Sequence, residues 1–317
     1  MNAEKPAMFC STIIPTVGRP TLTRAVESVL SQTILSSDFE VIVVNDSGFP
    51  LPEADWQKSE RVQVIHTNRR ERSVARNTGA AIAKGKYLHF LDDDDWVTSD
   101  AYHHLWELSQ LSDASWLYGI TQLVDRQSNP TIKLRHELQG NCFVQAMAGE
   151  WIPLQASLIE RNTFFDIGGF NPLLTGPEDI DLLRRVLLIG DLAETENHIA
   201  TVIMGGEGST TDYVQHPHAS RLAREDILDA PNSFQRMRAS ATNSIWLGRM
   251  LRIYLTSAVW NLMHRRIFHV LSRIIHVLLD LIIAGINILS RDFWQAVLNS
   301  YQSITFERGM QEARKVN

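Results

Sequence analysis

The first half of the chain alternates short runs of β-branched and aromatic residues with segments of helical periodicity, and this alternation restricts the possible folds most. The expected strands are residues 9–15, 39–44, 62–66 and 87–91, and the expected helices are residues 22–30 and 73–84, the second closed by Gly85. Alternating strands and helices place successive strands parallel in one sheet. We therefore predict an α/β fold with a mostly parallel central sheet flanked by helices.

The alternation loosens beyond residue 100. Further helices are expected at residues 100–111 and 178–188, and further strands at residues 116–124, 154–159 and 199–204, while residues 130–147 give no clear pattern. From residue 245 the chain changes to long, strongly apolar helices. We expect an α/β domain over residues 1–212, a linker or loop region over 213–244 and a C-terminal α-helical region over 245–317.

Charge is divided unevenly between these regions. Residues 245–317 carry nine Lys and Arg against four Asp and Glu, a local charge of +5, so the first 244 residues carry −11 and the whole chain −6. An acidic domain is not expected to bind nucleic acid. Basic, apolar helices are suited to the surface of an anionic membrane.

One stretch of the C-terminal region carries a narrow polar stripe on an otherwise apolar helix. The stripe consists of Arg266, His269, Arg273, His276, Asp280 and Asn287. The longest uncharged apolar run, residues 281–289, is shorter than the roughly 20 residues that span a bilayer. We expect peripheral membrane contact through residues 245–290, with packing against the domain or within a homo-oligomer as the alternative.

Two cysteines, Cys10 and Cys142, and no run typical of a signal peptide predict a reducing compartment and structural thiols rather than a zinc site. The expected location is therefore the cytoplasm, at the inner face of the cell membrane. The sequence contains no Gly-x-Gly-x-x-Gly motif and no P-loop. The chain therefore lacks the phosphate-binding motifs typical of dinucleotide oxidoreductases and P-loop kinases.

Four consecutive aspartates, Asp92 to Asp95, follow directly after the expected strand 87–91. The carboxyl ends of parallel strands meet at a ligand crevice, so these carboxylates are expected to face a site. Adjacent like charges repel unless a cation neutralises them, and Mg²⁺ or Mn²⁺ prefers carboxylate oxygens. The motif therefore predicts a divalent ion bridging the protein to a diphosphate, with a solvated acidic turn as the alternative.

A second acidic cluster, with Glu178, Asp179 and Asp181, opens the expected helix 178–188. Acidic residues in a first turn offset the helix dipole, so a structural cap is one interpretation. The other is a general base, because a hydroxyl that attacks an activated carbon must lose its proton.

Three weaker features accompany the acidic clusters. Arg69, Arg70, Arg72 and Arg76 form either a solvated face or a contact to an anionic ligand. The glycine-rich residues 205–210 favour a mobile loop near the site. His216 and His218 are candidate metal ligands or simply polar surface.

Five segments in this order resemble the family 2 glycosyltransferases of GT-A fold, over about residues 8–212. They are STIIPTVGRP (11–20), FEVIVVNDSG (39–48), SVARNTGAAIAKGKYLHFLDDDDW (73–96), FFDIGGFN (164–171) and GPEDIDLLRR (176–185). The resemblance implies a nucleotide-sugar-dependent, metal-dependent, inverting hexosyltransferase. UDP-sugars are its expected donors, and Mn²⁺ or Mg²⁺ is its expected cofactor.

The resemblance also implies roles for single residues. The nucleotide pocket would be lined by Pro15, Thr16 and Arg19, with Asp46 at the base, Arg76 and Asn77 near the diphosphate, and Asp93 and Asp94 at the nucleotide sugar. Asp95 and Asp94 would hold the metal, with His216 as a candidate third ligand. Asp179 matches the general base, and Glu178, Gly169 and Phe170 match the acceptor side.

The expected acceptor is a hydroxyl of a glycan or lipid-linked molecule in surface polysaccharide or glycolipid synthesis. One alternative is a nucleotidyltransferase that forms sugar nucleotides, although no glycine-rich, lysine-bearing loop stands near the N-terminus. The other is a non-catalytic nucleotide-sugar-binding protein. Release of nucleoside diphosphate from nucleotide sugars separates the three.

Overall fold

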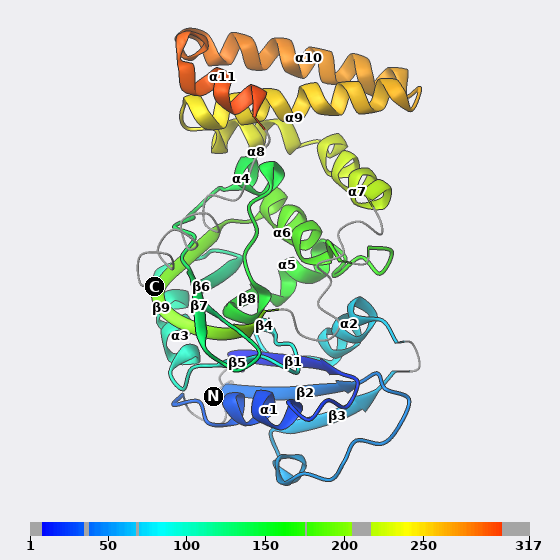
Figure 1. Ribbon diagram of the computed structural model, residues 1–317, viewed down its shortest axis with the longest axis vertical. Helices are drawn as coiled ribbons and strands as arrows, with labels where there is room; N and C mark the ends of the chain where they lie inside the picture. Colours follow the sequence, from blue (N-terminus) through cyan, green and yellow to red (C-terminus); the bar gives the residue numbers. More distant parts are fainter. Residues whose placement is uncertain (1–7, 35–37, 68–69, 175, 205–216, 300–317) are drawn as a thin grey trace, which may run out of the picture.

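The computed structural model describes residues 8–34, 38–67, 70–174, 176–204 and 217–299. Two parts follow each other along the long axis of the molecule (Figure 1). An α/β unit contains the central sheet, and a layer of helices covers one end of it. We call these parts the α/β unit and the helical layer.

Nine strands form one sheet in the described part of the chain. They are β1 Cys10–Thr16, β2 Phe39–Asn45, β3 Val62–His66, β4 Tyr87–Phe90, β5 Trp96–Val97, β6 Trp116–Val124, β7 Pro130–Leu134, β8 Ser157–Glu160 and β9 Leu192–Ile203. Their order is β3-β2-β1-β4-β8-β6-β9-β5, with β7 paired to β6.

The sheet is parallel in one half and mixed in the other. β3, β2, β1 and β4 are parallel, as the alternating pattern predicts. β8 then runs antiparallel to both β4 and β6, and β6 is parallel to β9. The expectation of a mostly parallel sheet is therefore correct for β3, β2, β1 and β4, whereas the other half mixes both directions and includes the antiparallel β6–β7 hairpin.

In the described residues of the α/β unit there are six helices and two 3₁₀ turns. They are α1 Leu22–Leu30, η2 Asp55–Lys58, α2 Arg72–Ile82, α3 Ala101–Leu111, α4 Phe143–Ala148, η3 Leu154–Ala156, α5 Arg161–Asp166 and α6 Glu178–Ile189. Successive side chains of β1 enter the two cores: Ile13 packs on the side of α2, α4 and α6, and Ile14 packs with α1 and α3. Helices thus cover both faces of the sheet.

Some element boundaries differ from those expected. α2 ends at Ile82, and Gly85 lies beyond the cap at Ala83. Gly85 is instead required by packing, because an added Cβ would lie 2.5 Å from the backbone nitrogen of Ser11. The first residues of the expected strand 154–159 form η3, and the last strand, β9, has twelve residues and begins at Leu192.

The helical layer contains five helices and a 3₁₀ turn in its described part. They are α7 Pro217–Asp229, α8 Ser233–Ser240, α9 Ser244–Met263, α10 Ile267–Ala284, η4 Gly285–Leu289 and α11 Arg291–Leu298. Much of the region assigned to a linker is thus helical. α9 packs between α10 and α11 on one side and α4 and α8 on the other, while α10 is the outermost helix (Figure 1).

Candidate active site

The aspartate motif Asp92–Asp95 begins two residues after β4 and is tied to the loop after β1. Thr16 donates its hydroxyl to Asp93 at 2.6 Å, and Arg19 forms an ion pair with Asp93 at 2.5 Å. The side chain of Asp93 is only 2% exposed. Two residues predicted to line the nucleotide pocket, Thr16 and Arg19, therefore both contact the buried carboxylate of Asp93.

Asp94 and Asp95 carry more negative charge than their surroundings neutralise. Burial and the charges of Asp92 and Asp93 raise the pKa of Asp94 to about 6, although Arg19 opposes the shift. Burial, followed by the charges of Asp92 and Asp94, raises the pKa of Asp95 well above its usual value. Asp95 also accepts a 2.9 Å hydrogen bond from the backbone of Ile203, which ties the motif to β9.

This donor set fits a hard divalent cation. It consists of carboxylate oxygens, which Mg²⁺ and Mn²⁺ prefer, and a cation would relieve the repulsion that adds to the effect of burial on both pKa values. No group of three or more His, Cys, Asp or Glu is arranged to hold a metal within the described residues. The candidate ligand His216 lies outside the described residues.

Arg76 on α2 joins the two acidic clusters. Its guanidinium is 1% exposed and lies 2.8 Å from Asp92, 3.4 Å from Glu178 and 3.3 Å from Asp179. Burial alone would lower the pKa of Arg76, but these three carboxylates outweigh it and raise the pKa. Arg76 in turn keeps the pKa of Asp92 below its usual value against the effect of burial. One buried cation thus fixes the aspartate motif next to the start of α6.

Glu178 and Asp179 are neighbours with different environments. Glu178 is 1% exposed, accepts a 2.8 Å hydrogen bond from the backbone of Gly176 and lies 3.6 Å from Arg72. Asp179 keeps 41% of its side chain exposed. Desolvation by the surrounding protein, followed by the negative charges of Glu178 and Asp92, raises the pKa of Asp179 to about 7, although the charge of Arg76 opposes this shift. Asp179 can therefore accept and release a proton near neutral pH, whereas Glu178 has the contacts of a structural residue.

The comparisons with known proteins agree with this arrangement. A family model described as glycosyl transferase family 2 matches residues 11–173. The chain belongs to this family. The match includes the loop after β1 and the aspartate motif and ends shortly before α6.

Two curated relatives illustrate the similarity. The poly(ribitol-phosphate) beta-N-acetylglucosaminyltransferase TarP of Staphylococcus aureus (strain N315) is 33% identical over 115 residues, which cover 34% of this chain and 35% of TarP. The uncharacterized glycosyltransferase EpsJ of Bacillus subtilis (strain 168) is 38% identical over 103 residues, which cover 31% of this chain and 29% of EpsJ. The alignments thus span about a third of either relative.

The crystal structure of S. aureus TarS 1-349 in complex with UDP-GlcNAc superimposes with a TM-score of 0.60. The superposition covers 84% of this chain and 89% of that one at 15% sequence identity. At this identity the likeness shows the fold. The α/β unit of this family 2 chain therefore has the GT-A fold.

The predicted acceptor-side residues lie behind the surface of the site. Asn77 donates to the backbone oxygen of Phe170 at 2.8 Å and accepts from its backbone nitrogen at 2.9 Å. The ring of Phe170 is 1% exposed, and Arg76 lies 5.2 Å from its centroid. Gly169 has a φ of +69°, and a Cβ there would lie 2.8 Å from the Asn77 side chain. These contacts fix the backbone of the segment that leads into α6.

Asp46, the predicted base contact, follows β2 and is 7% exposed. Its carboxylate accepts a 2.6 Å hydrogen bond from the backbone of Glu71 and another from the hydroxyl of Thr67. Its backbone nitrogen donates to Thr16 at 2.8 Å, and Pro15 precedes that residue in β1. Asp46 therefore connects the loops at the edge of the expected nucleotide pocket through hydrogen bonds.

Two residues of the site were not anticipated. Gln155 in η3 donates to Asp92 at 2.9 Å, and Arg24 on α1 donates to the backbone oxygen of Asp94 at 2.8 Å. The guanidinium of Arg24 also lies 3.8 Å from the centroid of Trp96. No motif in the sequence indicates Gln155. Arg24 could have been noticed, because the helical spacing of α1 places it off the apolar face of that helix.

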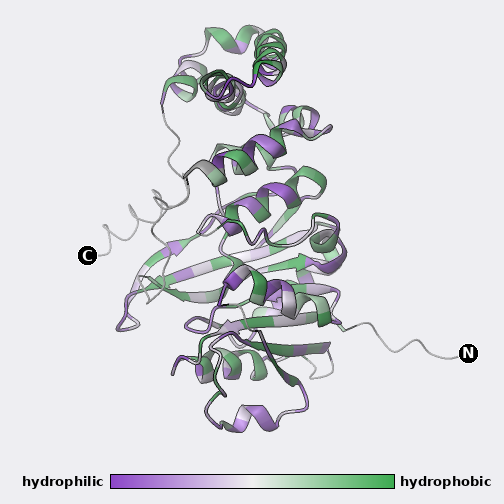
Figure 2. Ribbon diagram, turned by 90° about the vertical axis from the view of Figure 1, so that its right-hand side faces the viewer, coloured by the Kyte–Doolittle hydropathy of each residue, from purple (hydrophilic) through white to green (hydrophobic). Residues whose placement is uncertain are grey.

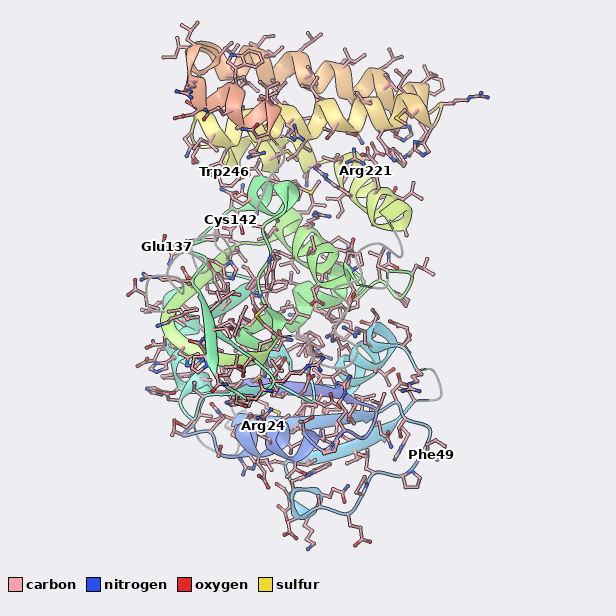
Figure 3. All side chains as sticks on the ribbon, viewed as in Figure 1. Arg24, Phe49, Glu137, Cys142, Arg221 and Trp246 are labelled. Atoms are coloured by element: carbon pink, nitrogen blue, oxygen red, sulfur yellow. The ribbon has the colours of Figure 1, made fainter. Side chains whose placement is uncertain are left out.

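A cavity of about 320 Å³ lies elsewhere, between the α/β unit and the helical layer. Glu137, Cys142 and Trp246 line it and lie toward that junction in Figure 3. Its lining includes no residue of the aspartate motif and none from the start of α6. The converging carboxylates therefore define the candidate site, and this cavity does not.

Proposed function

We propose that this chain is an inverting glycosyltransferase that moves a sugar from a UDP-sugar to a hydroxyl group of a glycan or lipid-linked acceptor. The observation that carries the proposal is the buried Arg76, which holds the aspartate motif and Asp179 at one site. Family membership and the GT-A fold support the reaction class. The UDP-GlcNAc complex of TarS supports a uridine nucleotide donor.

The reaction needs a base and a path for the leaving group. Asp179 takes the proton from the acceptor hydroxyl, and the oxygen attacks the anomeric carbon on the face opposite the diphosphate. A new carbon–oxygen bond forms while the bond to the diphosphate oxygen breaks, and the nucleoside diphosphate leaves with the electron pair. A single displacement of this kind inverts the anomeric centre.

The other site residues prepare this step. Arg76 holds Asp179 next to the motif, and Asp93 fixes Arg19, whose side chain is 31% exposed, beside the expected nucleotide pocket. Asp94 and Asp95 would hold Mn²⁺ or Mg²⁺, which when bound neutralises negative charge on the leaving diphosphate. A pKa near neutrality suits Asp179 as a base, because it must accept a proton from the acceptor and release that proton after each turnover.

The acceptor class rests on relatives. TarP is named a poly(ribitol-phosphate) beta-N-acetylglucosaminyltransferase, and a 27% identical relative from Bacillus spizizenii (strain ATCC 23059 / NRRL B-14472 / W23) is named a poly(ribitol-phosphate) beta-glucosyltransferase. Both names describe a transferase that acts on poly(ribitol-phosphate), a polymer. We therefore propose a role in surface polysaccharide synthesis, with a polyhydroxylated acceptor.

The test measures release of UDP from UDP-sugars, with and without Mn²⁺ and acceptor, together with donor binding by calorimetry. Asp179→Asn is expected to bind donor normally and to lose transfer, and Asp95→Asn to lose metal-dependent donor binding. Asp55→Asn, which alters an aspartate with a 95% exposed side chain, is the control and is expected to behave as the unaltered chain. Full transfer by Asp179→Asn would exclude the assigned base, and pyrophosphate release from a nucleoside triphosphate and a sugar phosphate would favour a nucleotidyltransferase.

A further inference from the structure

The outermost helix, α10, has an inverted distribution of polar and apolar residues. All eight of its exposed residues are apolar, with exposed fractions between 41% and 87%. They are Ile267, Phe268, Leu271, Ile274, Ile275, Leu278, Leu279 and Ile282. Its two charged residues, Arg273 and Asp280, are 1% and 0% exposed. A surface helix in water has the opposite pattern.

Buried charges hold α10 in this orientation. Arg273 forms an ion pair with Asp229 of α7 at 2.6 Å and donates to Ser257 of α9 at 2.8 Å. Glu225 of α7 is fully buried and accepts a 2.8 Å hydrogen bond from Asn261 of α9. Rotating α10 to hide its apolar face would separate these groups and leave charges buried without partners, which is costly. The apolar face therefore points outward as a fixed surface.

The surface continues beyond α10. Met263 at the end of α9 is 75% exposed, and Ile286 and Leu289 of η4 are 86% and 88% exposed. The segment Ile267–Leu289 is long and apolar enough to cross a bilayer by length and composition, yet only 17% of its most apolar window is buried. Figure 2 shows α10 at the top, coloured mainly as hydrophobic. So many exposed apolar residues in one segment are typical of a docking site.

We propose that this face of α10 docks in the plane of an anionic phospholipid bilayer. Arg265 in the α9–α10 turn is exposed, and Arg266 follows it at the start of α10. Residues 245–290 contain five arginines and one acidic residue, the buried Asp280. Arg273 is buried against Asp229, and the other four, Arg249, Arg252, Arg265 and Arg266, are at least partly exposed. Anionic headgroups complement this charge, whereas a second copy of the chain would bring like charges together. The aromatic ring of Phe268, 87% exposed, suits the interface between headgroups and acyl chains.

In-plane docking follows from the packing of the opposite face. α9 lies along α10, and α7 pairs with Arg273, so one side of α10 is committed to protein along much of its length. Within the described part of the chain, the outward side is the one left uncovered, and it can enter lipid to the depth of about 5–10 Å typical of interfacial helices. The proposal uses none of the catalytic residues and stands independently of the proposed transfer reaction.

The first test is flotation of the full chain with vesicles of phosphatidylcholine alone or mixed with phosphatidylglycerol. We expect binding to the mixed vesicles and at least tenfold weaker binding to phosphatidylcholine or at high salt. The double variant Ile275→Glu, Leu278→Glu should lose binding, because both changes place charge in the docking face. The control Leu111→Glu changes an equally apolar residue on α3 that is 85% exposed and should bind normally.

A second measurement reports depth. Cys10 and Cys142 are 0% and 4% exposed, so an environment-sensitive thiol dye can be directed to a single introduced cysteine. A dye at Leu278→Cys should shift to the blue on mixed vesicles and be quenched by lipids brominated near the headgroup. A dye at Leu111→Cys should not change. Quenching strongest at the bilayer centre would overturn the in-plane geometry in favour of a span.

Two further outcomes would overturn membrane docking itself. One is equal flotation of the double variant and the unaltered chain. The other is a discrete dimer in sedimentation velocity without lipid, dispersed by Ile275→Glu, Leu278→Glu and accompanied by no vesicle binding. That result would assign the face to a second copy of the chain.

Discussion

Replacing Asp280 with asparagine should stabilise the protein at pH 8 and leave its stability at pH 4 nearly unchanged. The Asp280 side chain is fully buried on α10, and neither carboxylate oxygen has a hydrogen-bond partner among the residues that the structure describes. Arg273, on the same helix, is already paired with Asp229. Burial raises the pKa of Asp280 to about 7. The ionised carboxylate is therefore disfavoured in the folded state.

The size of the effect follows from the difference between two pKa values. An aspartate in an unfolded chain has a pKa of about 3.9, so the folded state binds the proton more tightly by about three pKa units. Stability then decreases as the pH rises from about 4 to about 7 and is level above that, for a total loss of about 4 kcal/mol. An asparagine side chain has a similar shape and cannot ionise, so Asp280→Asn removes the loss.

The assay is thermal unfolding of both proteins without lipid between pH 4.5 and pH 8.5. At about 2 °C for each kcal/mol, Asp280→Asn should melt about 8 °C higher at pH 8 and only slightly higher at the lowest pH. Asp292→Asn, which alters an exposed aspartate on α11, serves as the control and should show a small difference that does not grow with pH. Equal melting temperatures at pH 8, or a difference independent of pH, would refute the reasoning.

Three further predictions concern the active site. Arg76→Leu leaves the buried Glu178 without its nearest cation and should lower the free energy of unfolding by about 3 kcal/mol in urea titrations, with partial recovery in Arg76→Lys. Gly169→Ala should destabilise by about 1 kcal/mol more than Gly168→Ala in the same assay, since both glycines have positive φ but only the first Cβ would clash. Because the Asp179 base works only when ionised, sugar transfer should rise with pH through about 7, as measured in a pH profile of kcat.

Local patterns predicted the half of the fold that consists of repeated strand and helix units. β3 and β6 have the boundaries expected from their β-branched and aromatic runs, and the aspartate motif lies where a parallel strand ends. Local patterns could not predict that β8 runs antiparallel to β4, because the direction of β8 depends on how η3 turns the chain next to β4. Gln155 belongs to that turn, so its contact with Asp92 has no local signal.

The polar stripe of the C-terminal region shows a second limit of sequence patterns. Periodicity correctly placed Arg273, His276 and Asp280 on one face of a helix. It could not decide which face meets protein, because that depends on partners distant in the sequence, such as Asp229 and the ring of Phe234, which stacks on His276 at 4.7 Å. The stripe faces inward, and the apolar face is exposed.

One helix connects the catalytic residue to the layer that carries the docking face. α6 begins with Glu178 and Asp179 at the active site, and its other end is held by Arg236 of α8, which donates to Gly190 at 2.5 Å and pairs with Asp191 at 2.8 Å. Twelve residues of α-helix measure about 18 Å. Because α8 packs on α9 and α9 on α10, packed helices within the described residues fix the distance between the base and the docking face. A membrane-docked chain would thus hold its active site at a set height, and only acceptor hydroxyls that reach that height from the bilayer, or arrive from solution, would meet Asp179.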